Sequence, residues 1–149
     1  MDFVQQAAHG DFEEFKHVLE NELIDNTRLN KALVAAVFYR RTNVVRLLLE
    51  HGADANSERH QALRFATNYG YDEEVVRLLL EHGADVHMDN EFPLRAVVYL
   101  MKRDKSEEKY ASMATLLLMY GADPTGINIP QWIVDQASVD TKPAIATPF

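Results

Sequence analysis

The chain has 149 residues, a net charge of −8 and no cysteine. A negative charge of this size argues against nucleic acid and anionic membranes as main partners, and without cysteine there is no disulfide or thiolate chemistry. No apolar run reaches the ~18 residues of a membrane-spanning helix. The N-terminus also lacks the basic start and apolar segment of a signal peptide. We therefore expect a cytoplasmic protein, with the nucleus as a second location.

The first predicted element is a short helix over residues 3–9, followed by a break at Gly10 and a second helix over residues 12–19. Asp11 is suited to cap the second helix, because its side chain can accept a hydrogen bond from a free backbone N–H. Glu13 and Glu14 follow in the first turn, where carboxylates favour the helix dipole.

The next elements are organised around a repeated sequence motif, which we call the repeated word. Val44–Asn56 reads VVRLLLEHGADAN, Val75–His87 reads VVRLLLEHGADVH, and Met113–Pro124 gives a looser copy, MATLLLMYGADP. The apolar stripe of each copy is too wide for a lone surface helix, so neighbouring helices must cover it. The glycine ends the helix and the aspartate begins a turn. The glycines lie 31 and 38 residues apart, which indicates a stacked repeat array.

The word Leu-Leu-x-x-Gly-Ala-Asp resembles the second helix and exit turn of the ankyrin repeat, whose period is about 33 residues. The resemblance covers roughly residues 3–136 and implies an all-α solenoid of about four helix-turn-helix units with a capping helix. We expect the units near residues 1–26, 27–57, 58–88 and 89–126, the cap at 127–137, and a flexible tail at 138–149.

A fixed spacing sets the register of the first helices. An apolar residue follows thirteen positions after each equivalent place in the second helices, namely Leu33, Leu63, Leu94 and Trp132. The family's T-P-L-H word is mostly absent there, and Arg64 and Arg95 replace its histidine, so we expect them to bond neighbouring turns.

At two places the sequence is compatible with two different local structures. Arg40 replaces a usual turn glycine, so either it adopts a left-handed conformation or the turn changes. Residues 102–109 account for the longer spacing and form either an exposed loop or a polar helix extension.

The resemblance implies binding through the concave side of the array, at first-helix ends and loop tips. First-helix candidates are Ala8, His9, Phe38, Tyr39, Asn68, Tyr69, Tyr99 and Leu100, with a polar rim of Glu58, Arg59, His60, Asp89, Asn90 and Glu91. Tyr39, Tyr69 and Tyr99 recur every 30 residues and predict a ladder of rings suited to an interface. In the alternative, the rings pack on the next helix and expose only their hydroxyls.

No metal, cofactor or catalytic motif is present in the sequence, so we predict no enzyme. His51 and His82 precede the capping glycines and are expected to be structural. A metal ion shared by His60 and His87 is the minor alternative. The resemblance also places Asn56, and His87 in the next unit, where the family can be hydroxylated on asparagine.

The combined prediction is a non-enzymatic module that binds one partner protein of basic or mixed surface, as a monomer or weak homodimer. Short inter-unit loops and the word x-A-L-R-x-A resemble the ankyrin proteins of large DNA viruses, which implies a host protein as partner. The alternative is a structural or self-assembling subunit that stacks through the end around Trp132.

Overall fold

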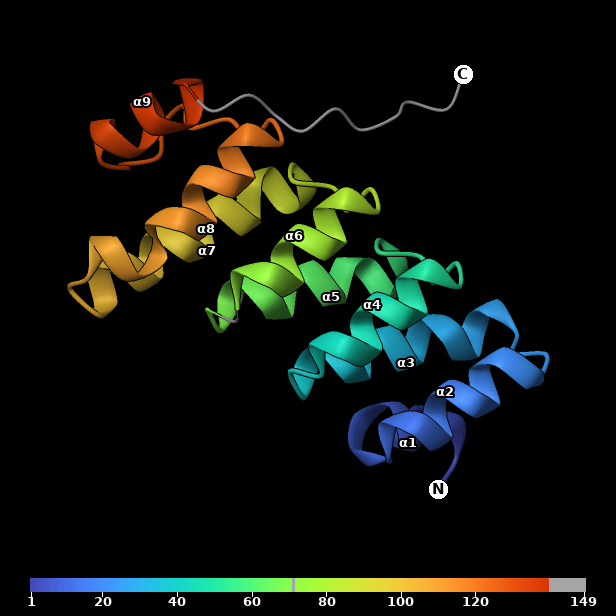
Figure 1. Cartoon of the computed structure of the whole chain (residues 1–149). Coiled ribbons are helices and arrows are strands. Elements are labelled where there is room, and N and C mark those ends of the chain that lie inside the picture. The colour runs from blue at the N-terminus through green and yellow to red at the C-terminus, as the bar shows by residue number, and fades with distance from the viewer. Residues whose placement is uncertain (71, 140–149) are drawn as a thin grey trace, which may run out of the picture. The chain divides into compact units, whose positions relative to one another are not determined.

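The computed structural model describes residues 1–70 and 72–139, and within these residues it is helical, without strands (Figure 1). The chain divides into two compact units, the first ending at Ala84 and the second beginning at Asp85. The first unit holds α1 (Phe3–His9), α2 (Phe12–Asn21), α3 (Asn26–Phe38), α4 (Thr42–Glu50), α5 (Ser57–Asn68) and α6 (Glu73–Glu81). The second holds α7 (Met88–Arg103), α8 (Glu107–Met119) and α9 (Gln131–Val139).

Helix pairs build the first unit. Each odd-numbered helix contacts the even-numbered helix that follows it, and α3 packs between α1 and α5 while α4 packs on α6. The core lies between these two rows, because the apolar side of each helix meets both its partner and its neighbour. Side chains at repeat-equivalent places are fully buried, among them Leu33, Leu48, Leu63 and Leu79.

The three repeated words end their helices in the same way. Gly52, Gly83 and Gly121 have φ values of 91°, 88° and 99°, which other residues rarely adopt. The next residue in each case is an alanine whose N–H donates to a carbonyl five positions back, at 3.0, 2.9 and 3.0 Å. This is the Schellman motif, and it confirms the predicted helix ends.

A one-turn left-handed segment lies before α5 and another before α7, where loops between repeats were expected. Glu58, Arg59 and His60 all have φ near 50–60° and ψ of 26–44°, and Asp89–Glu91 adopt nearly the same conformation. Right-handed helix begins only after each segment. Arg95 donates through Nε to Asn90 O and through Nη2 to Asp89 O, both at 2.8 Å. The predicted role of Arg95 in bonding a turn is therefore confirmed.

Residues 102–109 are mostly helix, with a short connection in the middle. α7 continues through Arg103 and α8 begins at Glu107, so only residues 104–106 form the connection. Asp104 holds it together by accepting from Arg103 Nε at 2.7 Å and from the Tyr110 hydroxyl. These hydrogen bonds, that of Arg103 first, lower the pKa of Asp104 to about 2.

The last predicted register is wrong by one residue. Leu33, Leu63 and Leu94 are fully buried, but Trp132 is 48% exposed and Ile133 takes the core place at 0%. The loop before α9 lacks the left-handed three-residue segment and has positive φ only at Gly126. This different loop is one residue longer and shifts the core position.

Other boundaries differ by smaller amounts. α3 begins at Asn26, because Asp25 caps it by accepting from Arg28 N at 2.9 Å. α9 runs through Val139, and the rest of the predicted tail, residues 140–149, lies outside the described residues. Arg40 has φ 58°, so its left-handed alternative is the one observed. None of the described helices is long and apolar enough to cross a membrane.

Candidate functional site: an aromatic surface on the first unit

Five rings gather where the odd-numbered helices of the first unit end, and we call them the aromatic surface: His9, Phe38, Tyr39, Phe65 and Tyr69. The Phe38 ring centroid lies 5.1 Å from that of Tyr39, 5.4 Å from Phe65 and 6.4 Å from Tyr69, all in edge-on geometry. The His9 ring lies 4.2 Å from Tyr39. Edge-to-face contacts of this kind hold rings in fixed orientations, so the surface is preformed.

The rings of the aromatic surface are also open to solvent. Phe38, Tyr39 and Tyr69 are 42%, 49% and 51% exposed. Large apolar groups that gather on one part of a surface are characteristic of binding sites, whereas single ones are ordinary. Tyr39 and Tyr69 thus contact neighbouring rings and are also about half exposed. The predicted binding ladder stays a prediction.

Helix ends determine where these side chains point. Tyr39 and Tyr69 each cap their helix, with N–H groups that donate to Ala35 O and Phe65 O at 3.0 and 3.1 Å. The residue after each tyrosine, Arg40 or Gly70, has positive φ and turns the chain away. Each ring thus stands at the end of its helix, on the side where the chain reverses.

An arginine ties this end of α3 to the preceding pair. Arg41 Nη1 donates to Gln6 O at 3.2 Å and to Ala7 O at 3.4 Å, near the end of α1. A cation at the carboxyl end of a helix also favours the helix dipole. These hydrogen bonds link the end of α1 to the turn after α3, next to the contact between His9 and Tyr39.

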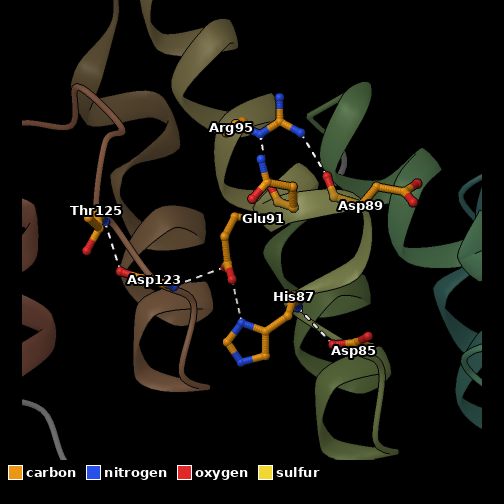
Figure 2. Close-up of polar contacts among 8 residues, drawn as sticks. Asp85, His87, Asp89, Glu91, Arg95, Asp123 and Thr125 are labelled. Carbon is orange, nitrogen blue, oxygen red and sulfur yellow. Dashed lines mark hydrogen bonds and ion pairs between the residues drawn. The ribbon is translucent and has the colours of Figure 1, made fainter.

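The predicted loop residues divide into exposed and inward-facing groups. Glu58, Arg59, Asp89 and Asn90 are exposed, as a polar rim requires. Glu91 is turned inward, with its side chain 15% exposed (Figure 2). It accepts from Asp123 N at 3.0 Å and faces His87 Nδ1 at 2.5 Å. Glu91 therefore joins two turns of the second unit and is not a rim residue.

The contact with Glu91 also affects His87. A hydrogen bond to the Glu91 carboxylate raises the pKa of His87, because it favours the charged imidazolium. In the other loop, His60 Nδ1 lies 3.1 Å from Asn56 Oδ1. The Asn56 amide donates to Gly83 O at 2.8 Å and so links two successive turns.

The minor alternative of a metal ion shared by His60 and His87 finds no support, since the described residues contain no group of three or more His, Cys, Asp or Glu side chains that could hold an ion. His51 and His82 have Nδ1 atoms 2.8 Å from Leu47 O and Leu78 O, one helical turn back. This repeat-equivalent hydrogen bond supports their predicted structural role.

A family model described as ankyrin repeats, three copies, matches residues 3–90, more than half of the chain. The chain belongs to the ankyrin repeat family. No curated protein matches it. Ankyrin repeats are in general protein–protein interaction modules. Within the described residues, α1–α8 make four ankyrin helix pairs and α9 is the helix that follows them.

The ankyrin register changes the predicted tyrosine ladder. Counted from the buried leucines, Tyr39 and Tyr69 occupy the same place, but Leu94 lies 31 residues after Leu63, whereas Leu63 lies 30 after Leu33. Tyr99 therefore corresponds to Phe38 and Asn68, while Leu100 corresponds to the two tyrosines. Leu100 is 1% exposed because α7 continues past it, so its predicted contact with a partner is wrong. Tyr99 is 63% exposed and Asn68 is exposed, as predicted.

Sequence reasoning placed Ala8 on the binding side and did not select Phe65. Ala8 is buried, at 6% exposure. Phe65 is half-buried, and its ring contacts Phe38 and Tyr69. A usable signal existed, since Phe65 lies four residues before Tyr69 and side chains at this spacing meet on one helix face.

Proposed function

We propose that this ankyrin repeat protein binds a partner protein through the aromatic surface, without catalysing a reaction. The observation that carries the proposal is the cluster of half-exposed rings held edge-on across α3 and α5. Preformed aromatic groups bury area at low entropic cost and supply much of the binding energy at interfaces.

The chemistry of the surface favours a partner with basic or mixed charge. The chain carries a net charge of −8, which attracts cationic surfaces and speeds their association. Tyrosine and phenylalanine faces also attract lysine and arginine side chains. Glu58, Arg59, Asp89 and Asn90 are proposed as polar contacts. Tyr99 and Asn68 remain proposed contacts, and His60 is a weaker one because it is half-buried.

The cellular setting is a further part of the proposal. Short left-handed turns in place of projecting loops give a compact unit boundary, which supports the resemblance to ankyrin proteins of large DNA viruses. On that basis the partner is a host protein in the cytoplasm or nucleus.

Affinity capture from cell extract tests the proposal by comparing the wild type with Tyr39→Ala/Tyr69→Ala. Leu23→Ala is the matched control, because Leu23 is 98% exposed and lies away from the rings. We expect the double variant to keep its helical circular dichroism and lose the main partner, while the control keeps it. The variant Tyr39→Phe/Tyr69→Phe should retain binding, since the rings rather than the hydroxyls provide most of the contact.

The competing proposal is a self-assembling subunit that stacks through the end carrying α9. Trp132 favours it, because an exposed tryptophan on the last described helix is suited to an interface. Light scattering after size-exclusion separates the two. A dimer that Trp132→Ala abolishes supports self-assembly, and a wild-type monomer at all concentrations contradicts it.

A further inference from the structure

A groove runs along α7 in the second unit, beside the segment that leads into α9. It consists of two adjoining hollows, of about 480 and 240 Å³, which share Val98, Lys102 and Asn128 in their linings. Both are formed within the second unit, between one side of α7 and residues 126–130.

The groove is open because α9 does not continue the helix row. In the first unit each odd-numbered helix packs on the next, α1 on α3 and α3 on α5. α9 instead packs mainly on α8, and Trp132 Nε1 donates to Glu107 Oε2 at 3.2 Å. In the part of the second unit that the structure describes, α9 therefore does not cover α7 along the groove.

The side of α7 that lines the groove combines apolar and cationic groups. Arg95, Val98 and Lys102 follow one another at intervals of three and four residues, which places them on one face of α7. Lys105 lines the larger hollow from the connection that follows the helix. Val98 and the nearby Met101 are buried to 5% and 3% exposure and form the apolar floor. Lys102 and Lys105 are exposed on the rim.

The two lysines are available to a ligand. Among the described residues, the structure gives neither ammonium group a hydrogen bond or ion pair, whereas Arg95 is held by the carbonyls of Asp89 and Asn90. Glu107 is the one carboxylate that lines the larger hollow, and it accepts from the Trp132 indole. The groove is thus locally cationic in a chain of net charge −8.

We propose that this groove binds an acidic segment of a partner protein. An apolar side chain of the segment lies over Val98 and Met101, and its carboxylates pair with Lys102 and Lys105. The acidic remainder of the chain repels such a segment, which restricts it to the groove. The proposal is independent of the aromatic surface, which lies in the first unit and suits a basic or mixed partner.

The test is an NMR titration of the full chain with a ten-residue synthetic peptide that alternates paired glutamates with paired leucines. The control peptide has glutamine in place of each glutamate. We expect the acidic peptide to shift the amide signals of Val98, Met101 and Lys102, and its binding to weaken with salt. The glutamine peptide should bind at least tenfold more weakly.

Charge reversal supplies the matched variants. Lys102→Glu/Lys105→Glu should weaken the acidic peptide about tenfold or more, and Lys16→Glu/Lys31→Glu, with the same charge change in the first unit, should leave it within twofold. Equal losses in both variants would reduce the effect to overall charge and overturn the proposal. So would peptide shifts confined to the first unit, or a wild-type dimer that only the groove variant loses while no peptide binds.

Discussion

The left-handed segment at Glu58–His60 leads to a prediction about stability. Three successive residues adopt a backbone conformation that costs each of them roughly 1–2 kcal/mol. Arg59 is exposed and its side chain has no hydrogen bond or ion pair within the described residues. Replacing it with glycine therefore removes backbone strain without removing a contact. Against this gain stands the larger conformational entropy of glycine in the unfolded chain, of roughly 0.4–1 kcal/mol.

The balance predicts that Arg59→Gly stabilises the protein by about 0.5–1 kcal/mol. With a urea m-value of about 2 kcal/mol/M, the midpoint rises by roughly 0.3–0.5 M. The control is Lys31→Gly, an exposed position inside right-handed α3, where glycine should destabilise by about 0.5–1 kcal/mol. Urea titrations followed by ellipticity at 222 nm give both values. If Arg59→Gly lowers the midpoint as Lys31→Gly does, the segment is not strained and the reasoning fails.

Three further outcomes follow from the same structure. Leu79→Ala, which truncates a fully buried side chain of α6, should cost about 2–5 kcal/mol in urea unfolding, and a cost below 1 kcal/mol would contradict the described core. The raised pKa of His87 means that its contact with Glu91 stabilises the fold fully below the unfolded pKa near 6.5 and loses this effect as pH rises through the raised value. The stability gap between wild type and His87→Gln should therefore be under about 1 kcal/mol, because the His87 side chain is 57% exposed. The gap should be largest near pH 5.5 and smaller above pH 8, and a gap that widens with pH would refute the contact. The Asp104 carboxyl should titrate by carbon-13 NMR near its pKa of about 2, and a midpoint close to 3.8 would exclude the described contacts with Arg103 and Tyr110.

Sequence alone was sufficient for the parts of the fold that local contacts determine. The word LLLEHGAD contains its own helix end, because the glycine, the following alanine N–H and the histidine Nδ1 all bond carbonyls within five residues. Asp11 and its cap are equally local. Such features depend on a few neighbouring residues, so the same letters predict the same geometry each time.

The left-handed turns could not be predicted in this way. Glu58, Arg59 and His60 favour right-handed helix by local propensity, yet the chain is left-handed there. Contacts from outside the segments accompany this conformation: Asn56, just before the first segment, donates to Gly83 O, and Arg95 holds the carbonyls of Asp89 and Asn90 in the second segment. A local sequence motif does not reveal a hydrogen-bond partner that lies 27 residues away.

The two mistakes in register have one physical origin. A spacing rule transfers a core position from unit to unit only while the intervening turn keeps its length and conformation. Tyr99 shifted from its predicted place because the preceding unit, from Leu63 to Leu94, is one residue longer than the one before it. Trp132 shifted because the turn before α9 has a different length and conformation.

The second shift has consequences for binding as well as for packing. When Ile133 instead of Trp132 enters the core, the indole is left outside, where it bonds Glu107 on α8. α9 then packs mainly on α8, and Arg95, Val98 and Lys102 on α7, with Lys105 just after it, line an open groove. Within the described residues, a one-residue change in a turn thus accompanies a side of α7 that α9 does not cover.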